Sequence, residues 1–139
     1  MFRTVVVGAD ASPTAAKAVD VAIDLVALSG GTLHVVSAYK PIARASGGVP
    51  PEFRDAVHGD SAVRSVLDEL SARARTRGVT VEGHDLKGDP ADAVLGVAER
   101  IHADLIVTGS QGMQRRVLSS IPNTIAHQAP CAVLVVKTD

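Results

Sequence analysis

Short runs rich in valine alternate along this chain with segments that repeat apolar residues at helical spacing, and this alternation most constrains the fold. A run of β-branched residues without polar alternation is typical of a strand buried on both faces of a parallel sheet. The predicted strands are residues 4–7, 33–38, 79–86, 105–107 and 132–136. With a helix between each pair, they predict an α/β fold with helices on both faces of a five-stranded parallel sheet.

The helix boundaries are marked by residues with known capping roles. Ser12 and Asp89 are suitable N-cap residues, and each precedes a proline that fits the first helical turn. We expect the first helix to end at Gly30 and the second, which begins near residue 63, to end at Gly78. A short fourth helix is predicted over residues 119–128. In residues 79–86, apolar and polar residues alternate only weakly, which predicts an outer strand of the sheet. Residues 40–60 are rich in Gly and Pro and predict a loop.

The composition fits one α/β domain over residues 1–139 and argues against several classes of partner. The chain has 139 residues, 46% of them hydrophobic and 2% aromatic, with a formal net charge of -1. We therefore expect neither nucleic acid nor an anionic membrane as a partner. A single cysteine, the absence of a recognisable signal peptide and the lack of a long apolar stretch predict a cytoplasmic protein.

The strand order decides where a ligand would bind. Two orders suit five alternating strands, 2-1-3-4-5 and 3-2-1-4-5, and each has a switch point beside the first strand. Ligands of such sheets bind at the carboxyl ends of the strands that flank this point. The candidate loops therefore follow the first and fourth strands, at residues 8–12 and 109–112.

The second of these loops has the pattern Gly109-x-x-Gly112 and is followed by basic residues and a helix start. Glycines let backbone N–H groups approach an anion closely, and the amides of a helix N-terminus add partial positive charge. Arg115 lies between the glycines and Ser119-Ser120, where its guanidinium could reach phosphates. Each residue also has a purely structural interpretation: Asp10 could close an Asx-turn, Ser120 could cap a helix, and Arg115 could be solvated on a surface loop.

Other chemistries find little support in the sequence. The five histidines show no metal-ligand spacing, either with Cys131 or with paired carboxylates, and no metal site is predicted. We interpret His34 as a packed residue in a buried strand and Cys131 as a small hydrophobic residue. The chain contains no G-x-S-x-G elbow and no complete Walker A motif, and no catalytic residue is identified.

Four segments together resemble the universal stress protein family, and the resemblance extends along the whole chain apart from the loop at 40–60. They are VVVGADAS at 5–12, GDPADAV at 88–94, ADLIVTGSQG at 103–112 and PNTIAHQAPCAVLVV at 122–136. The resemblance implies a Rossmann-like, adenine nucleotide alpha hydrolase-like three-layer sandwich with strand order 3-2-1-4-5. It also implies a role in stress response and a homodimer paired through the last strand, Ala132, Val133, Leu134, Val135 and Val136.

The family includes members that bind ATP, members that bind cyclic AMP and members that bind no nucleotide. The nucleotide-binding members carry a G-x2-G-x9-G-[ST] signature, whose first half is present here as Gly109 and Gly112. In the second half, only six residues separate Gly112 from Ser119, and serine replaces the family's glycine at Ser119. A three-residue deletion removes roughly 10 Å of chain length. A left-handed backbone at Ser119 would cost about 1–2 kcal/mol relative to glycine.

The resemblance therefore implies a non-catalytic protein that binds an adenine nucleotide: ATP accompanied by Mg²⁺, AMP or cyclic AMP. Slow ATP hydrolysis is the most activity that it implies. The adenosine end of the site is expected to be intact and the triphosphate end altered. The alternative is a homodimeric interaction module that has lost nucleotide binding. The residues expected to hold the adenosine are Gly8, Ala9, Asp10 and the main chain at Val35. Those expected to line the ribose and phosphates are Thr108, Gly109, Gln111, Gly112, Ser119, Ser120 and Ile121, with Arg115 as a further candidate for the phosphates.

Overall fold

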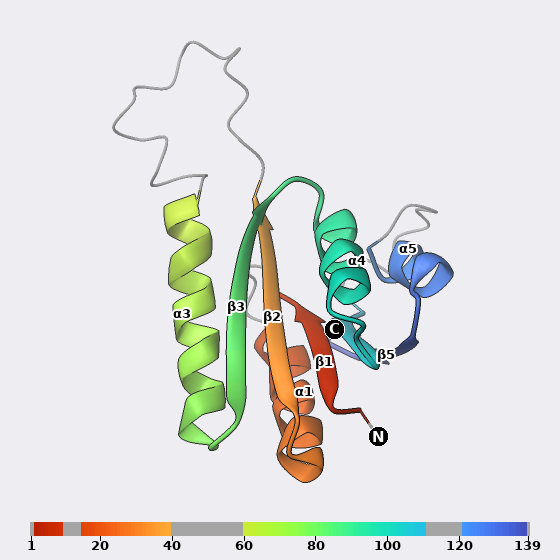
Figure 1. The fold of residues 1–139 in the computed structure, drawn as a ribbon. Helices are drawn as coiled ribbons and strands as arrows, with labels where there is room; N and C mark the ends of the chain where they lie inside the picture. The colour runs from red at the N-terminus through yellow and green to blue at the C-terminus, as the bar shows by residue number, and fades with distance from the viewer. Residues whose placement is uncertain (1, 10–14, 40–59, 111–120, 139) are drawn as a thin grey trace, which may run out of the picture.

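The computed structural model describes residues 2–9, 15–39, 60–110 and 121–138 (Figure 1). Its centre is a parallel sheet of five strands in the order β3-β2-β1-β4-β5. The strands are β1 (Thr4–Gly8), β2 (Thr32–Tyr39), β3 (Thr80–Lys87), β4 (Leu105–Gly109) and β5 (Ala132–Val136). The predicted strands and the order 3-2-1-4-5 are confirmed, and the alternative order 2-1-3-4-5 is wrong. As expected, residues 79–86 contribute an outer strand.

Four helices cover the sheet in two layers, within the part of the chain that the structure describes. They are α1 (Ala15–Ser29), α3 (Asp60–Thr76), α4 (Pro90–Arg100) and α5 (Ile121–Gln128). Helices α1 and α3 pack on one face, and α4 and α5 pack on the other. Figure 1 shows α3 beside β3 at one side of the molecule and α5 at the opposite side. The three-layer architecture expected from the sequence is therefore confirmed.

The apolar pattern of each strand explains the two cores on either side of the sheet. Successive side chains of a strand point to opposite faces, so alternate valines supply different cores. Val5 and Val7 of β1 pack with α1 and α3, whereas Val6 packs with α4 and α5. All three side chains are fully buried. Burying a valine or isoleucine contributes about 1.5–3 kcal/mol, so these strand residues help to stabilise the cores on both faces of the sheet.

The capping device expected at Asp89-Pro90 is present. The Asp89 side chain accepts a hydrogen bond from the Asp92 backbone N–H at 3.1 Å, and Pro90 occupies the first turn of α4. The cap satisfies one of the N–H groups that a helix start leaves without a partner. The equivalent device at Ser12-Pro13 and nearly all of the loop at 40–60 lie outside the described residues.

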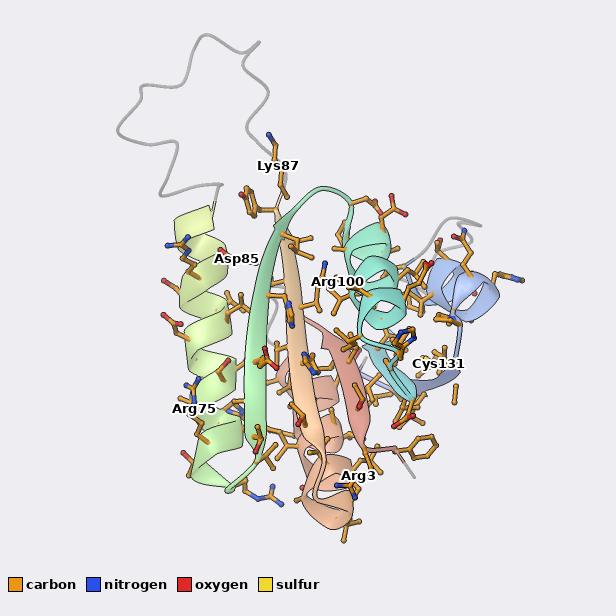
Figure 2. The ribbon with its side chains drawn as sticks, viewed as in Figure 1. Arg3, Arg75, Asp85, Lys87, Arg100 and Cys131 are labelled. Atoms are coloured by element: carbon orange, nitrogen blue, oxygen red, sulfur yellow. The ribbon has the colours of Figure 1, made fainter. Side chains whose placement is uncertain are left out.

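Two expectations about individual residues are also met. Cys131 is half-buried and packs against the core beneath α4 and α5, as expected of a small hydrophobic residue, and its position before β5 is seen in Figure 2. Burial raises the pKa of its thiol. His34 is buried on β2, with 7% of its surface exposed.

Among the described helices, none combines the length and the apolar character needed to cross a bilayer.

Candidate functional site

The carboxyl ends of β1 and β4 meet at the point where the strand order reverses. The two strands are neighbours, with Val7 opposite Val107, and they end at Gly8 and Gly109. Beyond the ends, the Ala9 amide donates to the Val36 carbonyl at 2.9 Å and the Ser110 amide donates to the Val136 carbonyl at 2.8 Å. The two chain segments therefore diverge toward β2 and toward β5. This divergence opens the crevice in which sheets of this kind bind ligands.

A cavity of about 120 Å³ occupies this crevice. Its walls are mostly small aliphatic side chains, with the hydroxyl-bearing residues Thr108 and Thr138 among them. The lining residues are Gly8, Ala9, Ala15, Ala18, Val36, Ala38, Pro90, Val94, Thr108, Gly109, Ile121, Pro122, Ile125 and Thr138. An apolar pocket with a few polar groups is the usual form of a small-molecule site.

Three helices begin at this cavity, through Ala15 of α1, Pro90 of α4 and Ile121 of α5. Helix N-termini carry partial positive charge and favour anions. At α4 this charge is already met by the carboxylates of Asp89 and Asp92. Neither α1 nor α5 has an acidic residue in its first turn. Among the helix ends that the structure describes at this crevice, those of α1 and α5 therefore favour an anionic group more than that of α4 does.

Thr138 combines burial with an unused hydrogen-bonding group at the cavity. Its backbone N–H donates to the Ser110 side-chain oxygen at 3.0 Å, which fixes the segment after β5 beside the end of β4. Its own hydroxyl oxygen is buried and has no hydrogen-bond partner in the described part of the chain. Leaving a buried hydroxyl unpaired costs about 1–3 kcal/mol. Because Thr138 lines the cavity, a polar atom of a ligand could supply the missing partner.

The two strand-ending glycines leave room that a side chain would fill. A Cβ at Gly8 would lie 3.0 Å from Val94 Cγ2, and one at Gly109 would lie 3.0 Å from Thr138 Cγ2. Both contacts are tighter than ordinary van der Waals packing. Glycine at these positions thus lets α4 and the segment after β5 approach the strand ends, and the cavity lies between them.

Several residues that the sequence assigned to nucleotide binding line this cavity: Gly8, Ala9, Thr108, Gly109 and Ile121. Val35, whose main chain was expected to meet the adenosine, is not among the lining residues, and its side chain lies in the core beneath α1 and α3. The next residue, Val36, lines the cavity. The remaining predicted residues lie outside the described residues: Asp10, Gln111, Gly112, Arg115, Ser119 and Ser120. Of the lining residues, Gly8 and Ala9 were expected to hold the adenosine, whereas Thr108, Gly109 and Ile121 were expected to line the ribose and phosphates.

Other lining residues were not predicted from the sequence. Ala15, Ala18 and Ala38 leave space because their side chains are small, and Val94 reaches the cavity from the inner face of α4. In a sequence, these residues have the same apolar pattern as any core position. Thr138 offered a weak indication of a polar site, because it is a polar residue directly after an apolar strand. Its burial could not be predicted, because that results from packing against Gly109.

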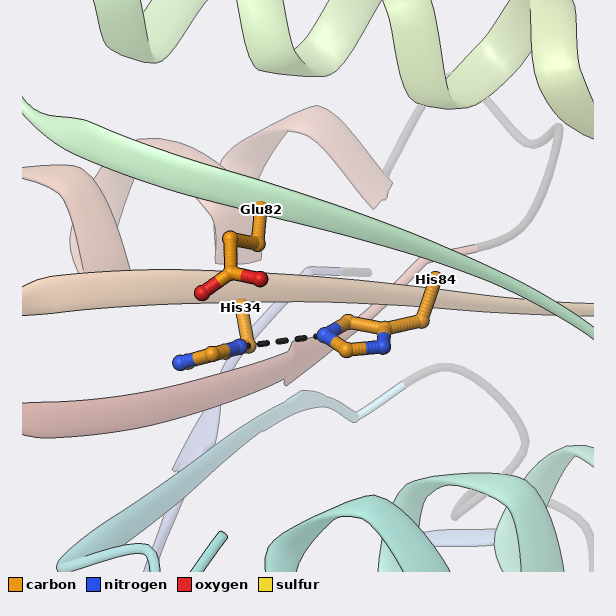
Figure 3. A group of neighbouring side chains, drawn as sticks. All are labelled: His34, Glu82 and His84. Atoms are coloured by element: carbon orange, nitrogen blue, oxygen red, sulfur yellow. Dashed lines mark hydrogen bonds between the residues drawn. The ribbon is translucent and has the colours of Figure 1, made fainter.

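A second group of polar side chains lies away from the cavity, on β2 and β3. His34 and Glu82 are direct partners in the register of the two strands, and His84 lies two residues further along β3. Figure 3 shows the three side chains on the same side of the sheet. His34 Nδ1 lies 3.0 Å from His84 Nε2. No local sequence pattern indicates this group, because His34 and His84 are 50 residues apart and only the strand register brings them together.

Burial lowers the pKa of both imidazoles in this group. For His34, burial outweighs the opposing effect of the Glu82 carboxylate. For His84, burial is the largest cause and the neighbouring His34 ring the next, and together they outweigh Glu82. Both pKa values lie below the ordinary 6.5, so both rings are neutral at neutral pH.

Comparison with known proteins finds relatives that match this chain over nearly its whole length. The sequence profile of the universal stress protein family matches residues 1–137. A universal stress protein of Mycobacterium tuberculosis strain H37Rv is 34% identical over 99% of this chain and 97% of its own length. A universal stress protein of Bacillus subtilis is 26% identical over 99% of this chain and all of its own.

Solved structures lead to the same group of proteins. A universal stress protein in complex with cAMP superposes with a TM-score of 0.82 at 31% identity, covering 99% of this chain and 98% of that one. A family member from Arabidopsis thaliana with AMP bound has a TM-score of 0.73, with 98% of this chain and 92% of that one covered. At 20% identity, the second similarity concerns the fold. By its sequence over nearly its full length and by its fold, this chain belongs to the universal stress protein family.

Proposed function

We propose that this protein binds an adenine nucleotide without turning it over, in the crevice between the ends of β1 and β4, as a signal or reserve in stress response. The observation that carries the proposal is the coincidence of two independent features. The largely apolar cavity at the switch point is lined by Gly8, Ala9, Thr108 and Gly109, which belong to the motifs identified in the sequence.

The walls of the cavity suit the adenine ring. A flat aromatic base gains free energy by burying its faces against small aliphatic side chains, here Ala18, Ala38 and Val94. Its nitrogens and the ribose hydroxyls need hydrogen-bond partners at the rim. Among the described residues, Thr138 lines the cavity and carries a hydroxyl that has no hydrogen-bond partner.

We expect the phosphates to lie toward the N-termini of α5 and α1, whose first turns contain no acidic residue. The run between Gly112 and Ser119 is shorter than the family signature by three residues, so less backbone is available to enclose a triphosphate. We therefore expect AMP or cyclic AMP to bind more tightly than ATP. A relative that is 31% identical and has the same fold was solved with cAMP, which supports this choice of ligand class.

Isothermal titration calorimetry of the full chain with AMP, cyclic AMP and ATP tests the proposal. We expect saturable binding with one nucleotide per chain, and an affinity for AMP above that for ATP. Ala38→Phe would fill the cavity and should abolish the heat of binding, because the ring would occupy the space meant for adenine.

Ala72→Phe is the matched control, since Ala72 is exposed on α3 and lies outside the cavity. It should bind as the wild type does. Asp10→Ala should weaken all three nucleotides if Asp10 meets the adenosine end. Absence of heat with every nucleotide would overturn the proposal and favour the nucleotide-independent interaction module.

The assembly expected from the family rests on β5. This strand ends the sheet, and Leu134 and Val135 are 38% and 37% exposed although both are large hydrophobic residues. Adjacent residues of a strand point to opposite faces, so apolar surface is exposed on both sides of this edge. We propose that a second copy of the chain pairs with β5 through residues 132–136, which would cover an edge that natural proteins rarely leave open.

A further inference from the structure

We propose that His34, Glu82 and His84 form a binding site for a divalent transition-metal ion, with Zn²⁺ as the best match. The site is separate from the cavity at the ends of β1 and β4, and its argument does not depend on nucleotide binding. It would link β2 to the outer strand β3, on the face of the sheet that α4 covers.

The strand register brings the three ligands together. Because β2 and β3 are parallel with His34 opposite Glu82 and Val36 opposite His84, the three side chains project from the same face of the sheet. One candidate ligand atom from each residue lies within 4.8 Å of the other two. Figure 3 shows the His34 and His84 rings side by side with the Glu82 carboxylate next to His34. A group of this size is compact enough to enclose a single ion.

The distance between the two ring nitrogens is close to that in a metal site. His34 Nδ1 and His84 Nε2 lie 3.0 Å apart. Two imidazole nitrogens that bind one Zn²⁺ at about 2.0–2.1 Å in tetrahedral geometry are about 3.3 Å apart. To bind one ion, the two nitrogens would move apart by a few tenths of an ångström, and the rings would turn so that both lone pairs point at the ion.

The chemistry of the three ligands selects the metal. Two imidazoles and one carboxylate form a ligand set used by zinc enzymes, with a fourth position left for water. Neutral imidazole is the form that binds a metal, and the burial of both rings favours that form. Ca²⁺ and Mg²⁺ prefer sets of oxygen ligands and would be poorly matched here. Because Glu82 is exposed, an ion has a path from solvent to the two rings.

Without a metal, the two rings satisfy one another through a single hydrogen bond, in which one imidazole donates and the other accepts. A bound ion would use the lone pairs of both nitrogens and the charge of Glu82, and would connect β2 and β3 through three bonds. Since the ion binds only the folded register, it should stabilise the fold by mass action. A metal site and a simple hydrogen-bonded pair of histidines therefore predict different results in a metal titration and in a measurement of thermal stability.

The test is titration of the metal-free full chain with Co²⁺, followed by visible absorption, and with Zn²⁺, followed by calorimetry. We expect one ion per chain, the intense absorption bands of four-coordinate Co²⁺, loss of those bands when Zn²⁺ is added, and a higher melting temperature with Zn²⁺. His84→Ala and Glu82→Gln should each weaken Zn²⁺ binding, His84→Ala by at least about 100-fold, which exceeds the usual effect of removing an outer-shell partner.

His127→Ala and Cys131→Ser are the controls, because each removes a potential zinc ligand outside the group. Both should bind Zn²⁺ as the wild type does. Glu82 is exposed, so Glu82→Gln is expected to fold even if His84→Ala does not. The inference is overturned if the wild type fails to bind Zn²⁺ at micromolar concentrations, or if Glu82→Gln and every folded His84 variant bind it as tightly as the wild type.

Discussion

Asp104 shows how one exposed side chain can position the start of two strands. Its Oδ2 accepts hydrogen bonds from the backbone N–H groups of Arg3, at 2.9 Å, and Thr4, at 3.0 Å. Its own backbone N–H donates to the Thr4 carbonyl at 2.8 Å. These bonds join the residue before β4 to the beginning of β1. The N–H donors of Thr4 and Arg3 stabilise the charged form and lower the pKa of the carboxyl group below its ordinary 3.8.

This shift predicts how stability depends on pH. A carboxyl group whose pKa is lower in the folded protein stabilises the fold at pH values above its unfolded pKa, and this contribution is lost as the pH falls through the folded pKa. Asp104→Asn should therefore be less stable than the wild type at neutral pH, and the difference should shrink below pH 3.8. Denaturant titrations across that range measure the effect.

Asp68→Asn, at an exposed position on α3, is the control. It should change stability little at any pH. A difference between Asp104→Asn and the wild type that stays constant down to the acid limit would show that the carboxylate charge has no part in holding the strands.

At the scale of elements, most of the fold could be predicted because local and global preferences agree. The valine-rich runs of β1, β2 and β4 are buried on both faces, as continuous apolar runs require. The ends of a strand depend on its pairing with a neighbour, which the local sequence does not show. Strand β3 extends to Lys87, one residue beyond the expected Leu86, because every residue from Thr80 to Lys87 pairs with β2. The register of β2 against β3 has no local signal, and for that reason the histidine pair was not foreseen.

The exposed edge at β5 leads to a prediction about assembly. If two copies pair through this strand, a lysine in place of Leu134 would put a charge into an apolar interface and should produce a monomer. Sedimentation or light scattering at micromolar concentration measures the mass. The wild type should be a dimer and Leu134→Lys a monomer.

Leu28→Lys is a matched control, because Leu28 is 87% exposed on α1 and lies outside the proposed interface. It should remain a dimer. A monomeric wild type, or a dimer that survives Leu134→Lys, would contradict pairing through β5.

At the scale of the whole molecule, the sequence indicated the end of the sheet at which the cavity lies, but not most of the residues that form its walls. Gly8 and Gly109 could be assigned because a parallel α/β sheet has one switch point, and the glycines follow the strands that flank it. Thr138 and the alanines of the cavity could not, since they reach it through the packing of α1, β2 and the segment after β5. The first turn of α4 contains an acidic residue and those of α1 and α5 do not. This difference bears on ligand binding only because the three helix starts line the same cavity, which the sequence does not show.

¹H–¹⁵N NMR of the labelled full chain can show whether an adenine nucleotide binds where β1 and β4 end. Spectra would be recorded during titration with AMP, then with cyclic AMP and ATP. We expect the largest shift changes on the amides of Gly8, Ala9, Thr108 and Gly109, with little change in α3. Unchanged spectra with all three nucleotides, or largest changes on α3 and β3, would contradict it.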